Sequence, residues 1–402
     1  MSPRTREPSA STSAPRLGDA VRRARAAERH RLAAGRAASS CEEVAASLVA
    51  LHATDPATVF LSVAARLADP GQGVPLVEES LYGPGPTLLR LLAMRRTMFV
   101  VERDKAPMVF AAAGRRVAER EREKLLAFLA EGGGWDERWL AAAEAEVAEV
   151  LGTRGELSGA ELGRLVPRLR EQVTVARGKP YERTQNVAGR IIRAMAAECR
   201  LQRRRPAGTW LSGQFRWAVA EPPAAVPERQ ARAELARAWL ASYGPGTEGD
   251  LKWWTGWGLR EVRAALLDVA AEPVRLDDGT EGWVLPGDTS GPAEAAPVAT
   301  LLPALDPTPM GWQRREWFLP DRHRGALFDA TGNVGPTVWW GGEVVGGWGQ
   351  RPDGAVVWRR LADRGTEAVD AVEQAAAELT SRLGGVRVTP RFRTPLEREL
   401  AA

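Results

Sequence analysis

One order of secondary-structure signals recurs about three times along the chain: successive helix signals followed by a β-hairpin signal. The copies occupy residues 17–105, 152–220 and 228–286. Their sequences differ, so the repeat is one of architecture rather than of sequence. Short helices that lead into a hairpin are typical of a winged helix, a variant of the helix-turn-helix. We therefore expect three tandem winged-helix units in an α+β fold that is mostly helical.

Local signals mark the elements of the first unit. Ser40 precedes acidic residues and then apolar residues at helical spacing, which predicts a helix that ends near His52. The pair Asp55-Pro56 predicts the start of a second helix, with the aspartate as N-cap. The leucine-rich segment Thr87–Met94 predicts a third helix, and Thr97–Val101 predicts a strand.

Similar signals mark the second and third units. Ser158 and Glu161 form a capping-box pattern that predicts a helix start. The amphipathic segment Arg183–Cys199 predicts a helix, and the alternating segment Leu201–Val219 predicts a hairpin. In the third unit, the turn signal Asp277-Asp278-Gly279 predicts another hairpin.

The segments outside the three units have different compositions. Residues 1–16 are rich in Ser, Pro and Arg, which predicts a disordered tail. Residues 106–151 predict a helical connector. After a Pro- and Gly-rich linker, residues 298–392 predict a β-rich C-terminal subdomain. Its signals are a hairpin at 338–345, a strand at 355–360, a helix at 367–383 and a last strand at 386–389.

Composition excludes several classes of protein. The 402 residues are too many for one ordinary core, and no run approaches the roughly 18 apolar residues that span a membrane. The N-terminus also lacks the pattern of a secretory signal, so we expect a cytoplasmic protein without membrane contact. Cys41 and Cys199 lie far apart, and His30, His52 and His323 lack metal-ligand spacing. We therefore expect no disulfide framework, no metal site and no cofactor.

Positive charge is concentrated in one segment, Arg183–Arg216. It carries eight arginines against one acid, Glu198, a local net charge of 8 − 1 = +7, whereas the whole chain carries +4. Arginine forks onto phosphates and guanine edges, so the segment predicts binding to double-stranded DNA. The alternative is a solvated arginine face in an arginine-rich proteome. The arginines are residues 183, 190, 193, 200, 203, 204, 205 and 216.

The predicted elements divide this basic segment into two parts. A recognition helix over Asn186–Glu198 would present polar side chains to the major groove. A wing over Arg200–Trp217 would reach phosphates or the minor groove. The candidate helix residues are Gln185, Asn186, Arg190 and Arg193, and the candidate wing residues are Arg203, Arg204, Arg205 and Arg216.

Several segments resemble a known family, the winged-helix DNA-binding family that contains the bacterial alkylpurine and interstrand-crosslink DNA glycosylases of the azinomycin-resistance type. They occur in the family's order from about residue 17 to residue 390. The resemblance implies three tandem winged-helix units and a C-terminal β-rich part. The segments are LHATDP at 51–56, MRRTMFVV at 94–101, GTWLSGQFRW at 208–217, KWWTG at 252–256, LLPALDP at 301–307 and PTVWWGGEVVG at 336–346.

The resemblance also implies a catalytic position. Family members carry Gln-x-Gln or Gln-x-Asp at the end of an early helix, where these side chains position or activate the attacking water. The matching residues here are His52 and Thr54, a departure from that pattern. A neutral histidine can accept a proton from water, and the threonine hydroxyl can orient the same water. The neighbouring Asp55 would stabilise a cationic sugar, although as a residue before proline it is first a helix N-cap.

Two further pairs match family segments. Arg95 and Arg96 would contact DNA phosphates, or would be solvated arginines beside a packed strand. Trp339 and Trp340 point to opposite faces of a predicted strand, so one can be buried while the other acts as a minor-groove wedge.

Three functions compete on these observations. The first is a DNA glycosylase that excises alkylated or bulky purine adducts from duplex DNA without a metal or cofactor. The alternative is a non-catalytic winged-helix DNA binder, either a transcriptional regulator or a damage sensor. The third is a protein-interaction scaffold, against which the charge of Arg183–Arg216 argues. Nothing resembles a dimerisation helix, so we expect a monomer.

Overall fold

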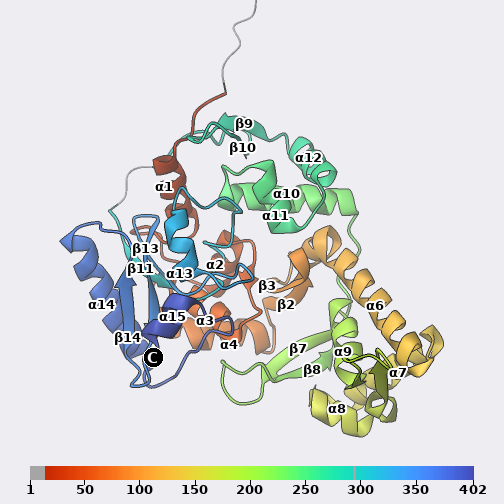
Figure 1. Cartoon of the computed structure of the whole chain (residues 1–402). Helices are drawn as coiled ribbons and strands as arrows, with labels where there is room; N and C mark the ends of the chain where they lie inside the picture. Colours follow the sequence, from red (N-terminus) through yellow and green to blue (C-terminus); the bar gives the residue numbers. More distant parts are fainter. Residues whose placement is uncertain (1–13, 293–295) are drawn as a thin grey trace, which may run out of the picture.

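The computed structural model describes residues 14–292 and 296–402 and shows a mixed α/β fold (Figure 1). Most of the predicted disordered tail lies outside these residues. Its last residues are held in place, because Arg16 forms a β-bridge with Arg275 and the Arg275 amide donates to the Pro15 carbonyl at 2.9 Å. No helix of the described residues is long and apolar enough to cross a membrane.

The first unit follows α1 and contains three helices and a small antiparallel sheet. The sheet order is β1-β3-β2, so the earliest strand lies beside the last strand of the unit. The elements are α1 (Asp19–Arg29), α2 (Cys41–Ser47), β1 (Leu51–His52), α3 (Pro56–Ala64), α4 (Gly73–Tyr82), β2 (Leu88–Ala93) and β3 (Thr97–Glu102).

The predicted helix at Thr87–Met94 is wrong. These residues form β2, which pairs with β3 from Leu88 opposite Glu102 to Ala93 opposite Thr97. A short leucine-rich run fits a buried strand as well as a helix, and here the tertiary pairing decides. The third helix is instead α4, whose first turn contains Gly73 and Pro75 and gives a weak helix signal. The predicted strand at Thr97–Val101 is confirmed as β3.

The second unit repeats this order with an inserted hairpin. Its three-stranded sheet has the order β4-β8-β7, the same arrangement as in the first unit. The predicted connector contains α6 (Arg115–Gly133) and α7 (Glu137–Arg154). The unit continues with β4 (Leu157–Ser158), α8 (Gly159–Leu165), the inserted hairpin of β5 (Gln172–Val175) and β6 (Arg183–Asn186), then α9 (Ala188–Ala197), β7 (Leu201–Pro206) and β8 (Phe215–Val219).

The third unit is the most compact. The strands β9 and β10 form its hairpin, and Gly246 bridges to Trp283 of β10 in the place of a third strand. The sequence order helix, short strand, helix, helix, hairpin thus occurs in all three units. The elements are α10 (Glu228–Tyr243), α11 (Glu248–Thr255), α12 (Leu259–Asp268), β9 (Glu272–Arg275) and β10 (Glu281–Val284).

The C-terminal part is a four-stranded antiparallel sheet with a long helix on one face (Figure 1). The predicted hairpin, strand and helix are present, but residues 386–389 form no strand, because Val388 donates to the Gln350 side chain instead of to a neighbouring strand. The elements are β11 (Ala299–Leu302), α13 (Arg324–Leu327), β12 (Thr337–Trp340), β13 (Glu343–Gln350), β14 (Val356–Arg360), α14 (Thr366–Leu383) and α15 (Pro395–Leu400).

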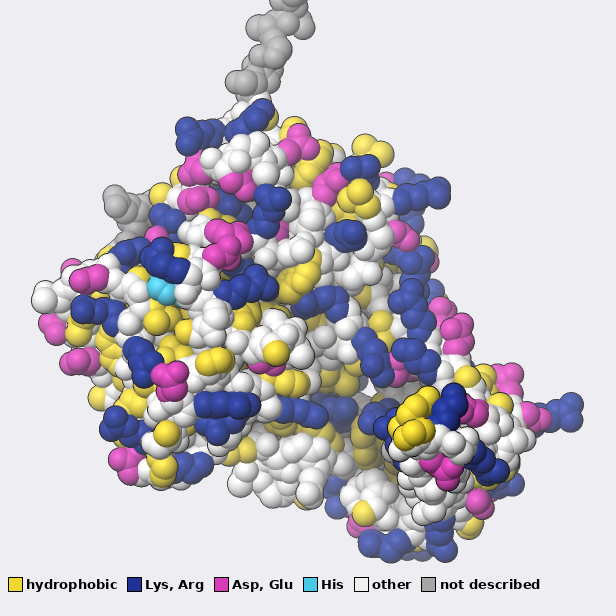
Figure 2. Space-filling model, viewed as in Figure 1, with side chains coloured by type: hydrophobic (Ala, Val, Ile, Leu, Met, Phe, Trp, Pro, Cys, Tyr) yellow, Lys and Arg dark blue, Asp and Glu magenta, His cyan; other side chains and the backbone are white. Residues whose placement is uncertain are grey.

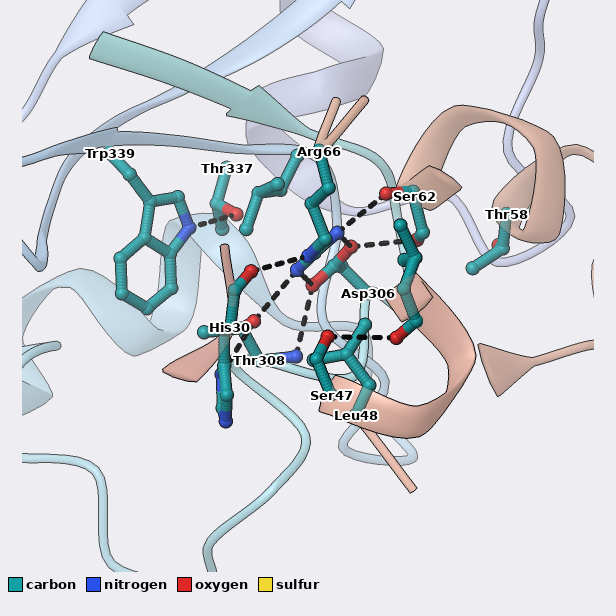
Figure 3. A network of polar contacts seen from close by, with 12 residues as sticks. His30, Ser47, Leu48, Thr58, Ser62, Arg66, Asp306, Thr308, Thr337 and Trp339 are labelled. Carbon is teal, nitrogen blue, oxygen red and sulfur yellow. Dashed lines mark hydrogen bonds and ion pairs between the residues drawn. The ribbon is translucent and has the colours of Figure 1, made fainter. Parts of the chain in front are cut away.

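A buried polar network joins α3 to the C-terminal part (Figure 3). Arg66 and Asp306 form an ion pair at 2.7 Å, and neither side chain is exposed. Ser62 donates to the same carboxylate at 2.7 Å, and the Arg66 Nε–H donates to the His30 carbonyl at 2.9 Å. Each charge is thus paired and hydrogen-bonded, as a buried ion pair requires. The network holds α3, the helix capped by Asp55, in a single position.

Candidate active site and DNA-binding surface

His52 lies on β1 rather than at the end of a helix. It pairs with Phe99 of β3, and the two rings meet edge to face with centroids 5.6 Å apart. Only 6% of the residue is exposed. The backbone N–H of Thr54 donates to the Nδ1 atom of His52 at 3.5 Å. Because the helix α2 ends at Ser47, the predicted helix end near His52 is wrong.

The surroundings of His52 keep its ring neutral. Burial, and secondarily the charge of Arg95, lower the pKa of His52 to about 3. A neutral imidazole that accepts a hydrogen bond at Nδ1 carries its proton on Nε2. In this tautomer the Nε2–H is a donor, so this nitrogen of His52 can donate a hydrogen bond but cannot take a proton from water.

Thr54 reaches an open cavity of about 540 Å³ between the first unit, the second unit and the C-terminal loop. The threonine is half-buried, and its carbonyl accepts a hydrogen bond from the Arg391 guanidinium at 3.2 Å. Trp210 of the β7–β8 loop packs on Phe60 of α3 at 5.2 Å, so this loop bridges the two units beside the cavity. The cavity lining includes Thr54, Ser158, Arg203, Gln214, Trp217 and Arg391.

Asp55 is the N-cap of α3, as predicted. Its Oδ1 atom accepts from the Ala57 amide at 3.1 Å, and its Oδ2 atom accepts from the Arg391 amide at 2.8 Å. The residue is 6% exposed, and burial raises its pKa despite these two hydrogen bonds. The carboxylate therefore joins the first unit to the C-terminal loop.

The predicted recognition helix begins later than expected. Gln185 and Asn186 belong to β6, and only α9 (Ala188–Ala197) is helical, so the placement of these two residues on the helix is wrong. The segment before α9 pairs with β5 instead, where Thr174 lies opposite Thr184. Such cross-strand threonine pairs stabilise a strand over a helix.

The two candidate arginines of α9 differ in their contacts. Arg190 lies over the ring of Phe128 at 4.0 Å and donates to the Gln185 side chain at 3.1 Å. Arg193 makes no side-chain hydrogen bond or ion pair within the described residues. It lines a basic hollow of about 340 Å³ between α6, α9 and the hairpin of the first unit, with Arg96, Lys124, Arg190 and Arg203.

The hairpin predicted at Leu201–Val219 is confirmed as β7 and β8, but most of its candidate arginines are already paired. Arg204 donates to Glu156 at 2.6 Å, and Arg205 pairs with Glu78 of α4. Arg216 donates to the carbonyl of Glu156. Arg204 and Arg216 thus make contacts within the second unit, and Arg205 joins it to the first, which accounts for part of the local charge excess.

Arg203 is different, because it has no acidic partner among the described residues. It lies 5.1 Å from the ring of Phe215 and 5.5 Å from that of Trp217, and its Nε atom is buried without a hydrogen-bond partner. Burial and the nearby charges of Arg90 and Arg391 lower its pKa to about 10. Arg203 lines both the cavity at Thr54 and the basic hollow.

Arg95 and Arg96 form the turn between β2 and β3 and do not end a helix. Both adopt the left-handed region, with φ of 53° and 61°. Arg96 forms an ion pair with Glu121 at 2.7 Å. Arg95 lies over the ring of Trp253 in α11 at 3.9 Å, a contact that joins the first unit to the third.

The tryptophan pair of the C-terminal hairpin lies mostly in the core. Trp339 is 3% exposed, stacks on Phe318 at 5.3 Å and donates to the Thr337 hydroxyl at 2.8 Å. It is buried against the protein itself, which contradicts a direct DNA contact. Trp340 is half-buried and lines a separate cavity beside α1.

Lys and Arg side chains gather around a hollow on the face shown in Figure 2. Sequence reasoning missed several of the residues that matter here, namely Arg391, Gln214 and Trp253. Arg391 contacts residues 336 and 337 positions away, so no local signal could have identified it. Within the described residues, no group of three or more His, Cys, Asp or Glu could hold a metal ion.

An arginine-lined cavity at Thr54, between repeated helix-and-hairpin units, is typical of a DNA-processing protein. Residues 45–382 match the model of the AlkZ-like DNA glycosylase family. The structure resembles the Streptomyces sahachiroi DNA glycosylase AlkZ with a TM-score of 0.68 and 22% sequence identity, over 93% of this chain and 99% of that chain. A search of the curated proteins found no match.

The chain therefore belongs to the AlkZ-like DNA glycosylase family. The predicted resemblance and the predicted glycosylase function are confirmed by this match, and the alternative of a non-catalytic DNA binder is not favoured.

Proposed function

We propose that the chain excises alkylated purines from duplex DNA by hydrolysing the N-glycosidic bond without a metal or cofactor. The observation that carries this proposal is the position of His52 and Thr54. They occupy the place that the resemblance assigns to catalysis, and Thr54 opens into an arginine-lined cavity. We also propose that the three units are winged helices, because each has the same element order and two share the same three-stranded sheet order.

The proposed reaction requires little acid catalysis from the protein. An N-alkylated purine carries a positive charge and leaves as a neutral base, so the protein must chiefly place a water and stabilise the cationic sugar. His52 ends β1, and Thr54 follows it by two residues and donates its backbone N–H to the His52 ring. The water accepts a hydrogen bond from the Nε2–H of His52 and donates one to the hydroxyl of Thr54.

Charged side chains complete the proposed site. The Asp55 carboxylate, next to Thr54 in sequence, stabilises the developing positive charge on the sugar. The proton of the attacking water leaves through the open cavity to solvent. Arg193 and Arg203, which have no acidic partner among the described residues, hold backbone phosphates on the side of the second unit, and the protein binds as a monomer.

A comparison of two classes of damaged base tests this proposal directly. Duplexes with a single N7-methylguanine, which is cationic, are compared with duplexes that contain 8-oxoguanine, which is neutral. We expect abasic product only from the cationic lesion, because a neutral purine would need an acid that the site lacks. Equal release from both duplexes, or release from neither, would contradict the proposed substrate class.

A further inference from the structure

Three arginines and two aromatic rings alternate beside the candidate active site. The Arg95 guanidinium lies 3.9 Å from the centre of the Trp253 ring, and the Arg315 guanidinium lies 4.8 Å from the same ring. Arg315 is also 5.2 Å from the ring of Phe328, which Arg324 approaches at 5.5 Å. We call this set of five residues the arginine ladder.

The ladder is assembled from distant segments of the chain. Arg95 comes from the β2–β3 turn of the first unit, and Trp253 comes from α11 of the third. Arg315, Arg324 and Phe328 come from the long segment between β11 and β12. Three parts of the fold therefore meet at one point, and the chain places a positive side chain there from two of them.

The arginines of the ladder have no directly paired acid among the described residues, although the charges of Asp250 and Glu316 act on Arg315. None of its three arginines forms an ion pair within the described residues. Arg315 is 7% exposed and donates its Nε–H to the Pro309 carbonyl at 2.7 Å, but its Nη2 atom is buried without a partner. The Nε atom of Arg95 is likewise buried and unsatisfied. Burial lowers the pKa of each of these two arginines to about 10.

Adjacent arginines show that this absence is selective. Arg96 pairs with Glu121 at 2.7 Å, and Arg314 pairs with Asp278 at 3.2 Å. Arg96 and Arg314 are thus directly ion-paired, whereas the arginines of the ladder form no ion pair in the part of the chain that the structure describes. Simple packing does not explain the choice, because a buried cation without a partner is costly and an apolar side chain would fill the space.

We propose that the arginine ladder binds a backbone phosphate of duplex DNA on the opposite flank of the active site from Arg203. The ladder shares no residue with the cavity at Thr54, and Arg324 is exposed, which leaves the ladder open to a ligand. A guanidinium held over an aromatic ring keeps its N–H donors in one plane and suits a phosphate oxygen. This inference rests on the proposed function only in taking DNA as the ligand.

The first test measures how salt affects binding to an undamaged duplex. Each phosphate contact contributes a slope of about 0.9 in log affinity against log salt. We expect Arg324→Gln and Arg315→Gln each to weaken binding and to lower that slope by about 0.9. Arg314→Gln is the matched control, because Arg314 is adjacent in sequence but already paired with Asp278. Slopes equal to that of the control would overturn the proposal.

The second test identifies the phosphate. A set of duplexes carries one neutral methylphosphonate at successive positions. At one position, the methylphosphonate should lower the affinity of the wild-type protein. The same duplex should not lower the affinity of Arg324→Gln further, because the variant has already lost that contact. Additive losses at every position would contradict the proposal. Arg324 is exposed, so this variant should keep the thermal stability of the wild type even if Arg315→Gln does not.

Both tests are independent of catalysis, because they use undamaged DNA. A wild-type protein that binds through the ladder and releases no base would refute the proposed function and support the ladder. A protein that releases base, with salt slopes unaffected by either ladder variant, would refute the ladder alone.

Discussion

The backbone N–H of Thr54 donates to the Nδ1 atom of His52 at 3.5 Å. This hydrogen bond places the imidazole proton on Nε2. Since burial and the charge of Arg95 lower the pKa of His52 to about 3, the ring stays neutral and keeps this tautomer at neutral and mildly acidic pH. The residue that sequence comparison suggests as a base is thus arranged as a hydrogen-bond donor.

The pH dependence of base release follows from this arrangement. A histidine base with an ordinary pKa of about 6.5 would lose activity as the pH falls below that value. With its pKa lowered to about 3, His52 protonates only in much stronger acid. We expect the single-turnover rate to stay flat between about pH 5 and about pH 8. A rate that falls about tenfold per pH unit below about pH 6.5 would contradict the neutral donor role.

The two roles of Asp55 can be separated by a matched pair of variants. Asparagine is as good an N-cap as aspartate, so Asp55→Asn should keep the bond to the Ala57 amide, lose only the bond to the Arg391 amide, and lower the rate of base release by removing the charge. Asp55→Ala should in addition cost about 1 kcal/mol of unfolding free energy through the lost cap. Urea denaturation and single-turnover kinetics measure the two effects. An unchanged rate in Asp55→Asn would show that the carboxylate has no electrostatic role.

The buried pair of Arg66 and Asp306 should dominate the stability of the joint between α3 and the C-terminal part. Arg66→Met leaves the Asp306 carboxylate buried without a partner and should cost about 3–5 kcal/mol. The double variant Arg66→Met, Asp306→Leu should recover much of that loss, because neither charge remains. Urea denaturation measures both. A double variant that is no more stable than the single one would show that the hydrogen bonds of the network matter more than the uncompensated charge.

The arginines of the β7–β8 hairpin differ in whether they form an ion pair with an acidic side chain. Arg203 has no acidic partner in the described part of the chain, so Arg203→Gln should weaken duplex binding and lower its salt slope by about 0.9 for one lost phosphate contact. Arg205 is already paired with Glu78, so Arg205→Gln should leave the slope unchanged. Fluorescence anisotropy over a range of salt concentrations measures both. The opposite ranking would show that Arg205 exchanges Glu78 for a phosphate when DNA binds.

Local signals predicted the parts of the fold that depend on neighbours in sequence. The cap at Asp55 and the capping box of Ser158 and Glu161 are present, because each involves residues at most three positions apart. Thr87–Met94 was wrongly expected to be a helix, since an apolar run of this length takes the structure of its partner, here β3. Gln185 and Asn186 were misplaced for the same reason, because their partner is β5.

The candidate site was predictable only in part. The resemblance led to His52 and Thr54, but not to the hydrogen bond that sets the tautomer. The charge count drew attention to Arg204 and Arg205, which are paired, as much as to Arg203, which is not. Arg315 and Arg391 lie in segments without a local sequence signal, and their importance depends on contacts with residues far away in the chain.

The most direct measurement is single-turnover release of N7-methylguanine from a duplex by wild-type protein and two variants of Thr54. Thr54→Ser keeps the hydroxyl that we propose holds the attacking water, and Thr54→Val keeps the shape without it. Wild type and Thr54→Ser should form free base and an abasic site, and Thr54→Val should be slower by about tenfold or more, the loss of one positioning hydrogen bond. Equal rates in Thr54→Val and Thr54→Ser would contradict the account of this site, as would tight binding of the duplex by the wild type with no abasic product.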